Sequence, residues 1–350
     1  MTPLTTDDAL RQLLDEGRTR AAATDSEHAR LWDALAAATE GGKRFRPGLV
    51  TAAHDALGGT CSAASATVGA AVELLHTAFV IHDDVIDGDH LRRGRLNVSG
   101  TFDAHALAFG AAPEAAGDFG RTAGILAGDL ALAAAIRAVA TCGAPSHVVS
   151  RLLDLFDAAL HTTAAGELAD VRLSLRVGPA SLPESLAMEE QKTSVYSFAL
   201  PLQAGALLAG VDGETVDRLG EAGRLLGIAF QLVDDLLGVF GDPTRTGKSA
   251  TSDLRTRKQT PLLTHARSTP EWERIRTYVG RDLTDAELAE ARRLLTASGS
   301  RLFVEELAEA HLATARAMLG QLGIASELLA TVTSRTAVLA GLVRGAEVAA

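Results

Sequence analysis

Three carboxylates lie close together in the segment HDDVID, where Asp83, Asp84 and Asp87 follow a run of apolar side chains. A helix turns by about 100° per residue, so it would place Asp83 and Asp87 on one face, with Asp84 beside them. Like charges at this spacing destabilise a helix unless a cation lies between them. Carboxylate ligands without cysteine or histidine favour a hard ion such as Mg2+, which shares its coordination shell with phosphate oxygens. The segment therefore predicts a magnesium site for a phosphorylated substrate.

One such motif is equally compatible with a solvated acidic helix end, so a second acidic segment matters. In FQLVDDLLG, helical spacing places Gln231, Asp234 and Gly238 on one face, with Asp235 beside Asp234 and Phe230 just off the row. The surrounding leucine and valine side chains favour burial of this helix. Buried carboxylates need partners, and a metal ion supplies them.

Basic residues are placed where an anionic ligand would need them. Lysine supplies only Lys43, Lys192, Lys248 and Lys258 of the 33 basic residues, and arginine supplies the others. The segment GGKRFRP is predicted to form a basic turn that opens a helix at Pro47, where backbone N–H groups would help to bind a diphosphate. The pair Arg92 and Arg93 follows the first acidic segment, and Lys248 follows the second.

Composition limits the class of protein. The chain has 350 residues, of which 47% are hydrophobic and 22% charged, enough for a sizeable core, and we predict a single domain over residues 1–350. Its formal net charge of -11 argues against nucleic-acid binding. The two cysteines, Cys61 and Cys142, form no disulfide framework, which fits a reducing cytoplasm. No export signal and no membrane span are predicted, because the amino terminus is acidic and charges interrupt the apolar stretches.

Apolar residues recur at three- and four-residue spacing almost everywhere, and alanine is frequent, so we predict an all-α protein. Long helices are expected over residues 68–86 and 122–140, with a break between them at residues 110–120. The segment from Thr284 to Glu287 predicts a capping box that opens another helix.

These motifs occur together in the order and approximate spacing of a known family. From about residue 28 to at least residue 265, with GGKRFRP, HDDVID, LRRG, QKT, FQLVDD and a later GK, the chain resembles the trans-isoprenyl diphosphate synthases, or polyprenyl synthetase family. The resemblance implies a bundle of long helices around a central active-site cavity, usually as a homodimer. It also implies two or three Mg2+ ions and prenyl transfer from an allylic diphosphate to isopentenyl diphosphate.

The resemblance assigns roles to the residues of these motifs. Asp83, Asp87 and Asp234 would bind Mg2+, and Asp84 and Asp235 would complete or orient the metal shells. The allylic diphosphate would contact Arg92, Lys192 and Lys248, with Lys258 near the cavity mouth, Phe230 and Gln231 nearby, and Thr193 and Gln231 steadying the carbocation. Isopentenyl diphosphate would be bound without a metal by Lys43, Arg46, His76 and Arg93.

The chain also departs from the family pattern. Gly238 stands where the second acidic motif commonly has its last aspartate, and Asp242 is a poor substitute because Gly241 and Pro243 predict the helix end. Glu167 replaces an expected glutamine, whereas Asp170 matches an acidic position that supports the site indirectly.

Product length is predicted to depend on the helix below Asp83. Phe79 lies one turn away on the same face and is a candidate floor for the prenyl tail, while Ala78 beside it leaves space. An ordinary core aromatic is the alternative interpretation of Phe79. This pair favours geranylgeranyl diphosphate as product, with farnesyl or longer diphosphates as alternatives.

Two other functions share some of these features. A class I terpene cyclase also has a metal-binding acidic helix, but it has no use for a second diphosphate site, and only 4% of this chain is aromatic. A non-catalytic partner subunit would explain Gly238, although the first acidic motif and the basic segments are intact.

Overall fold

The computed structural model of the chain describes residues 4–175, 178, 180–241, 252–324 and 328. Most of them are helical and only four lie in strands, which confirms the predicted all-α class. The chain forms two compact units, unit 1 with Met1–Phe156 and Ala204–Val211, and unit 2 with Asp157–Gln203 and Asp212–Ala350. The single domain over residues 1–350 stays a prediction.

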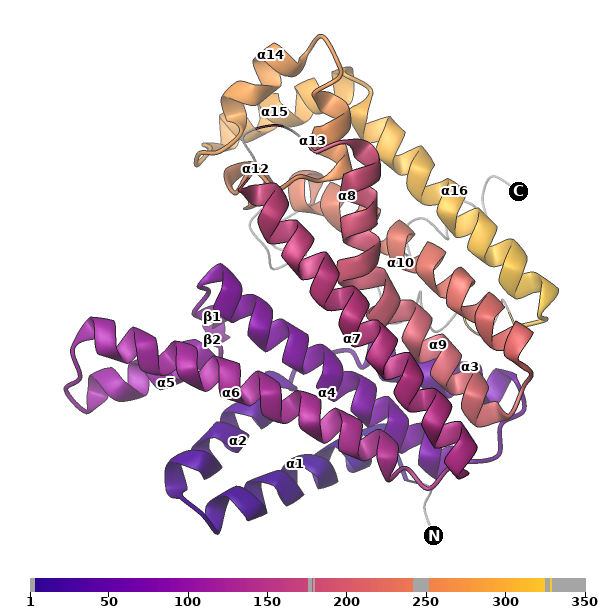
Figure 1. Cartoon of the computed structure of the whole chain (residues 1–350). Coiled ribbons are helices and arrows are strands. Elements are labelled where there is room, and N and C mark those ends of the chain that lie inside the picture. The colour runs from indigo at the N-terminus through magenta and orange to yellow at the C-terminus, as the bar shows by residue number, and fades with distance from the viewer. Residues whose placement is uncertain (1–3, 176–177, 179, 242–251, 325–327, 329–350) are drawn as a thin grey trace. The chain divides into compact units, whose positions relative to one another are not determined.

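Unit 1 is built on two long helices that lie side by side (Figure 1). Its elements are α1 (Thr6–Ala22), α2 (Ser26–Ala38), α3 (Phe45–Ala56), α4 (Ser62–Asp87), β1 (Leu91–Arg92), β2 (Arg95–Leu96), α5 (Val98–Ala108) and α6 (Pro113–Ala140). Helix α4 is central, since α1, α3 and α6 all pack against it. Its Val68, Val72 and Leu75 are fully buried. The apolar part of α4 thus anchors the acidic residues at its carboxyl end.

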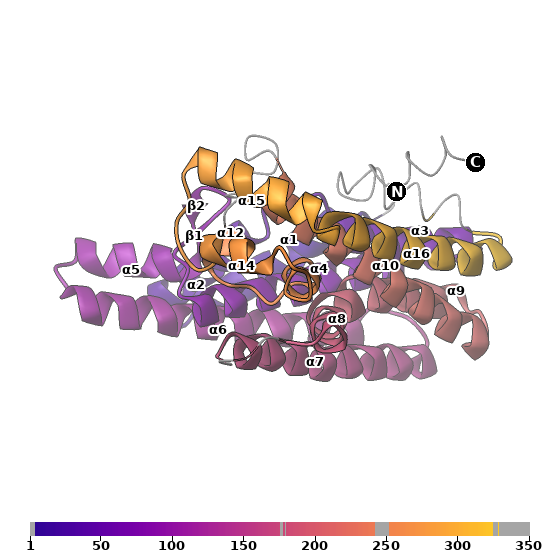
Figure 2. The same ribbon diagram turned by 90° about the horizontal axis from the view of Figure 1, so that it is seen from above.

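Unit 2 is organised around α10 (Gly213–Phe240), which lies beside α16 (Ser300–Gln321) (Figure 1, Figure 2). Its other elements are α8 (Leu182–Glu189), the π-helix η1 (Glu190–Ala199), α12 (Ser252–Arg255), α13 (Pro261–Ala266), α14 (Trp272–Ile275), the 3-10 helix η2 (Arg276–Tyr278) and α15 (Asp285–Ala297). Leu232 and Leu236 of α10 share a core with Leu295 and Val304. The second acidic segment therefore projects from a buried helix, as the sequence predicts.

Two helices contribute to both units. Helix α7 spans Ser146–Ser174, and α9 spans Leu200–Ala209. In α7, Phe156 at the end of the unit 1 segment is fully buried. The unit 2 part of α7 carries Glu167 and Asp170.

The boundaries of several helices differ from those expected. Helix α4, which spans Ser62–Asp87, extends the predicted 68–86 helix by more than a turn at its start and by one residue at its end. The capping box between Thr284 and Glu287 is confirmed at α15. The predicted break over residues 110–120 is confirmed but is shorter than expected, because α5 ends at Ala108 and α6 already begins at Pro113, a residue that fits the first turn of a helix. Helix α3 begins at Phe45 instead of Pro47, so Arg46 lies in its first turn.

A two-residue hairpin interrupts the helices directly after the first acidic motif, and sequence periodicity did not predict it. Strand β1 pairs antiparallel with β2, with Leu91 opposite Leu96. The turn residues Arg93 and Gly94 have φ values of 54° and 74°. Positive φ at both central residues matches the twist of a tight hairpin, and glycine adopts it at little cost. The hairpin returns Arg92 towards the end of α4.

Two described helices, α4 and α6, are long and apolar enough to cross a membrane by length and composition alone. In α4, 78% of the most apolar window is buried inside the fold, as expected of a core helix. In α6 the buried share is 44%, and its exposed side chains include Phe119, Ile125 and Leu126. Helix α6 therefore presents an apolar face that unit 1 does not cover.

Glu287 makes the start of α15 sensitive to pH. Arg281 and the Thr284 cap lower the pKa of this carboxyl from 4.5 to about 2. A carboxyl whose pKa is lowered in the folded state stabilises the protein at pH values above its unfolded-state pKa. This contribution is lost as the pH falls through the folded-state pKa. Glu287→Gln should therefore reduce the free energy of unfolding near neutral pH, with the deficit shrinking as the pH falls from 4.5 towards about 2.

Urea unfolding of both proteins across this pH range measures the difference. Glu309→Gln is the matched control, since Glu309 is exposed on α16. A deficit for Glu287→Gln that is constant with pH would contradict the assignment.

Candidate active site

The basic turn in unit 1 is held by Arg44, a residue to which the sequence assigned no separate role. Arg44 has a φ of 49° and caps the start of α3. Its guanidinium donates to Asp7 Oδ1 at 2.9 Å, to the Thr39 carbonyl at 2.6 Å and to Glu73 Oε1 at 2.7 Å. Glu73 is buried on α4, so this ion pair is shielded from water and strengthened. Arg44 thus fixes the segment that carries Lys43 and Arg46.

The hairpin contributes a further arginine to the same region. Arg93 Nη1 donates to the Glu40 carbonyl at 2.9 Å, which links the hairpin to the segment before the basic turn. His76 lies half-buried on α4. Burial, together with the charges of Arg46, Arg93 and Arg92, holds the pKa of His76 well below 6.5. A neutral imidazole surrounded by three arginines can donate a hydrogen bond to an anion without adding charge.

The first acidic motif is paired with Arg92. Arg92 Nε donates to Asp84 Oδ1 at 2.8 Å, and its Nη2 donates to Asp83 Oδ2 at 3.2 Å. Asp84 is only 3% exposed, and burial raises its pKa although Arg92 opposes that shift. Asp83 is partly exposed and Asp87 is exposed. Of the three carboxylates, Asp84 is therefore the one most buried in the fold, and Asp83 and Asp87 are the two that are more accessible to solvent.

In unit 2, Lys192 joins two carboxylates of α7. Its Nζ lies 2.7 Å from Asp170 Oδ2 and 3.0 Å from Glu167 Oε2. Glu167, the departure from the family pattern, thus forms an ion pair with Lys192, whereas an uncharged glutamine could only accept a hydrogen bond from it. Thr193, the next residue, is partly buried on η1.

The second acidic motif is also embedded in polar contacts. Gln231 Nε2 donates to Asp235 Oδ1 at 3.1 Å, and Lys258 Nζ lies 3.9 Å from the same oxygen. Asp235 is 2% exposed, whereas Asp234 is partly exposed. The second motif thus repeats the division seen in the first, with one buried aspartate beside a more accessible one.

Glu189, at the end of α8, is a buried acid that the sequence analysis did not identify. Its side chain is 3% exposed, and neither carboxyl oxygen has a hydrogen-bond partner among the described residues. Burial and the neighbouring carboxylate of Asp235 raise its pKa well above 4.5, with Lys258 acting in the opposite direction. No helical pattern links residues 189 and 235, so only the fold reveals that they are neighbours.

The carboxyl end of α10 is capped by a side chain from α15. Arg292 Nε donates to the Val239 carbonyl at 2.6 Å, and its Nη2 donates to the Gly241 carbonyl at 2.9 Å. These contacts satisfy carbonyls that lack helical partners. They confirm the predicted helix end at Gly241 and hold the last turn, including Gly238.

The ligand types in both units fit Mg2+. No group of three or more Asp, Glu, His or Cys side chains in the described part of the chain is arranged as a complete metal site. Magnesium usually takes one or two carboxylates and completes its shell with water and phosphate oxygens. The accessible carboxylates Asp83, Asp87 and Asp234 therefore fit a metal that binds together with a diphosphate.

The other predicted residues have less specific surroundings. Phe230 packs on Phe198 with ring centroids 5.4 Å apart. Phe79 is half-buried, and so is Asp83, which lies one turn further along α4. Ala78, in contrast, is fully buried in unit 1. Lys248 and Asp242 lie outside the described residues.

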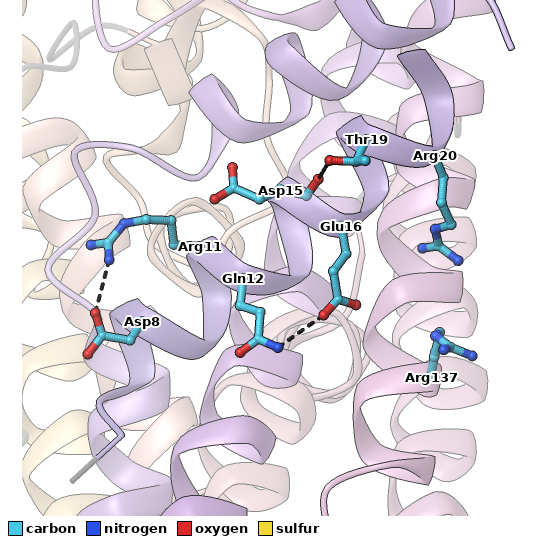
Figure 3. Close-up of a pocket in the computed structure, with 8 residues that line it drawn as sticks. All are labelled: Asp8, Arg11, Gln12, Asp15, Glu16, Thr19, Arg20 and Arg137. Carbon is cyan, nitrogen blue, oxygen red and sulfur yellow. Dashed lines mark hydrogen bonds and ion pairs between the residues drawn. The ribbon is translucent and has the colours of Figure 1, made fainter. Parts of the chain in front are cut away.

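A surface groove in unit 1 contains none of these residues. It encloses about 600 Å3 and is lined by α1 side chains and by Arg137 of α6 (Figure 3). Its charges are mixed, and Arg11 is already paired with Asp8 at 2.9 Å. The groove therefore adds no ligand-binding residue to the site.

Comparison with known proteins gives a consistent result. A family model described as polyprenyl synthetase matches residues 28–295. The chain is 35% identical over 227 residues to a geranylgeranyl diphosphate synthase of Sulfolobus acidocaldarius, which covers 64% of this chain and 63%, just under two thirds, of that protein. It is 35% identical over 292 residues to a (2E,6E)-farnesyl diphosphate synthase of Mycobacterium bovis, covering 81% and 75% of the two chains.

A solved structure is similar over nearly the whole chain. It is a geranylgeranyl pyrophosphate synthase from Corynebacterium glutamicum complexed with isoprenyl diphosphate and magnesium. The TM-score is 0.84 at 28% identity, and the match covers 95% of this chain and 98% of that one.

The position of Lys192 depends on a glycine in the facing helix. A Cβ on Gly166 of α7 would lie 2.3 Å from the Lys192 backbone nitrogen, and backbone cannot move aside as a side-chain tip can. Gly166→Ala should therefore displace η1 and destabilise the protein by about 1–3 kcal/mol, as overpacking does.

Thermal and urea unfolding measure this effect. Gly320→Ala is the control, because Gly320 lies on α16 with open space where a Cβ would stand. Equal stability of the two variants would show that the contact between α7 and η1 is not tight.

Proposed function

Since the chain belongs to the polyprenyl synthetase family, we propose that it condenses isopentenyl diphosphate with an allylic diphosphate to form a short-chain trans-prenyl diphosphate. The observation that carries the proposal is the pair of ligand-binding features in unit 1. An acidic face suited to Mg2+ lies on α4, and a separate basic region surrounds His76. In the proposed reaction the allylic diphosphate binds through Mg2+, whereas isopentenyl diphosphate binds at a site without metal.

The allylic diphosphate binds at the acidic motifs in this proposal. Asp83, Asp87 and Asp234 hold two or three Mg2+ ions, which when bound act as Lewis acids for the departing diphosphate. Arg92 and Lys192 exchange carboxylate partners for phosphate oxygens. Both cations are already oriented by their ion pairs, so little reorganisation is needed when the diphosphate binds. Lys248 and Lys258 contribute further positive charge.

Isopentenyl diphosphate binds at the basic region of unit 1. Lys43 and Arg46 from the basic turn, Arg93 from the hairpin and neutral His76 supply the donors. Arg44 does not contact the ligand but positions the turn through Glu73. Fixing both reactants in this manner supplies a proximity contribution of several kcal/mol.

The reaction then proceeds through an allylic carbocation. The carbon–oxygen bond of the allylic diphosphate breaks and its electron pair leaves with inorganic diphosphate. The isopentenyl double bond attacks the cation, and the resulting tertiary cation loses a proton to the departed diphosphate. Thr193 and Gln231 steady the charge through their side-chain oxygens, while Phe230 and the apolar helix faces exclude water.

The proposal also includes the domain organisation, the oligomeric state and the cellular location of the protein. We propose that residues 1–350 act as a single domain. The exposed apolar face of α6 supports a homodimer, because an uncovered face of this kind commonly marks an interface. Both substrates are water-soluble diphosphates, which fits a cytoplasmic enzyme.

The purified protein with Mg2+ should convert labelled isopentenyl diphosphate and an allylic primer to a longer prenyl diphosphate, measured by chromatography. Asp83→Asn should reduce kcat at least about a hundredfold, because losing a metal ligand removes Lewis-acid stabilisation worth several kcal/mol. Asp154→Asn removes the same charge from an exposed position on α7 and should leave activity unchanged.

Three outcomes would contradict the proposal. Equal activity of Asp83→Asn and wild type would exclude the metal role of α4. Hydrocarbon formed from the allylic substrate alone would indicate a terpene cyclase. Inactivity that a second protein restores would indicate a partner subunit.

We further propose geranylgeranyl diphosphate as the main product, with Phe79 as the partial floor of the tail pocket. Its half-buried position one turn from Asp83 supports this role, whereas fully buried Ala78 packs within unit 1. Phe79→Ala should lengthen the products by one or more isoprene units at similar total turnover.

Product chain lengths from the same chromatographic assay decide this point. Phe102→Ala, which removes a buried aromatic of α5, is the control for general loosening of unit 1 and should leave chain length unchanged. An unchanged product from Phe79→Ala would remove the floor assignment.

A further inference from the structure

His82 directly precedes the first acidic motif, but its side chain lies on another side of α4. At about 100° per residue, the mean direction of His82 and Val85 differs by about 150° from that of Asp83 and Asp87. The two aspartates therefore lie on one side of the last turns of the helix, and His82 and Val85 lie nearly opposite them. Helix α6 packs against α4 and contacts both of these residues (Figure 1).

Two glycines of α6 permit this close contact. A Cβ on Gly128 would overlap the imidazole ring of His82, and a Cβ on Gly124 would overlap the side chain of Val85. A glycine inside a helix costs about 1 kcal/mol relative to alanine. Both glycines therefore lie where the end of α4 approaches the backbone of α6.

The imidazole of His82 also makes a directional contact with α6. Its Nε2 lies 3.3 Å from the Ile125 carbonyl oxygen and 3.5 Å from Asp129 Oδ1. A carbonyl and an ionised carboxylate only accept hydrogen bonds, so Nε2 carries the proton and donates it. Neutral and charged imidazole can both donate in this way. The contact therefore does not depend on the charge of the ring.

The end of α4 is thus held from two directions. The hairpin holds it through Arg92, which donates to Asp84 and Asp83, and α6 holds it through His82. Magnesium requires near-ideal octahedral geometry, so carboxylates that bind it must keep a fixed direction. A small rotation of the last turns would change the direction of Asp83 and Asp87 together.

We propose that His82 is a positioning residue for the metal-binding carboxylates of α4. By donating a hydrogen bond to the backbone of α6, it fixes the rotation of the last turns and with it the direction of Asp83 and Asp87. His82 itself contacts neither metal nor substrate in this proposal. The inference rests on the proposed function for the role of the two aspartates.

The competing explanation is that His82 only fills space between α4 and α6. Its loss would then lower the stability of the protein without a selective effect on metal binding. Two substitutions separate these roles. His82→Leu keeps an apolar side chain of moderate size but removes the donor, whereas His82→Gln keeps an N–H donor at a similar distance from the backbone.

The test is a titration of the full-length protein with Mn2+, a spectroscopic substitute for Mg2+, in the presence of inorganic diphosphate. Electron paramagnetic resonance gives the dissociation constants of the bound ions. His82→Leu should weaken Mn2+ binding at least about tenfold, as the loss of a group that orients a metal ligand does. His82→Gln should bind Mn2+ nearly as well as wild type. Gly128→Ala, which displaces the ring from the other helix, should weaken binding as His82→Leu does.

Kinetic constants provide a second measurement. The KM for the allylic diphosphate should rise in His82→Leu, whereas the KM for isopentenyl diphosphate should stay unchanged. His105→Leu is the matched control, since His105 Nε2 lies 3.2 Å from Glu27 Oε2 in unit 1. It removes a contact between histidine and an acid without touching α4, and it should alter neither Mn2+ binding nor either KM.

Each result has a defined meaning. Mn2+ affinity of His82→Leu equal to wild type would overturn the proposal, and so would equal weakening in His82→Leu and His82→Gln, because the donor would then have no effect. If His82→Leu does not fold, Gly128→Ala decides, and wild-type affinity in that variant would overturn the proposal. Failure of the proposed function would be distinct, since wild type would then bind Mn2+ but not condense the two diphosphates.

Discussion

The constraint on which this structure depends is the burial of like-charged carboxylates on apolar helices. Asp84 and Asp235 follow long runs of core residues and are almost fully buried. A carboxylate in such a place destabilises the fold unless opposite charge lies within a few ångströms. The hairpin with Arg92 supplies that charge in unit 1, and Lys258 supplies it in unit 2. Both of these cations belong to the residues for which a role in diphosphate binding is proposed.

This arrangement connects folding to binding. Arg92 and Lys192 pair with acids in the folded chain, and in the proposed function they exchange these partners for phosphate oxygens. Arg44 contributes differently, because its pairing with buried Glu73 fixes the basic turn that carries Lys43 and Arg46.

The sequence predicted the helical class, the placement of both acidic motifs on buried helices, and the end of α10 at Gly241. These features depend on local spacing, which a sequence displays directly. The start of α6 at Pro113 was missed because glycines at 117 and 120 resemble a loop, although a helix tolerates them. The hairpin escaped prediction because strands of two residues carry no periodic signal.

The sequence also did not predict contacts between residues that are far apart along the chain. Glu73 is an acid within an apolar run, and its partner Arg44 lies 29 residues earlier. Glu189 was missed since nothing near it in sequence pairs with it, and its meaning depends on Asp235. A charged residue placed within an otherwise apolar helical pattern is the one signal that would have drawn attention to Glu73.

Anomalous diffraction from crystals grown with Mn2+ and inorganic diphosphate tests the central claim most directly. The account predicts metal peaks within coordination distance, about 2 Å, of carboxylate oxygens of Asp83 and Asp87 in unit 1 and of Asp234 in unit 2. Diphosphate should be bound beside these ions, in contact with Arg92 or Lys192. Well-defined diphosphate without metal at these aspartates, or metal bound only elsewhere, would contradict it.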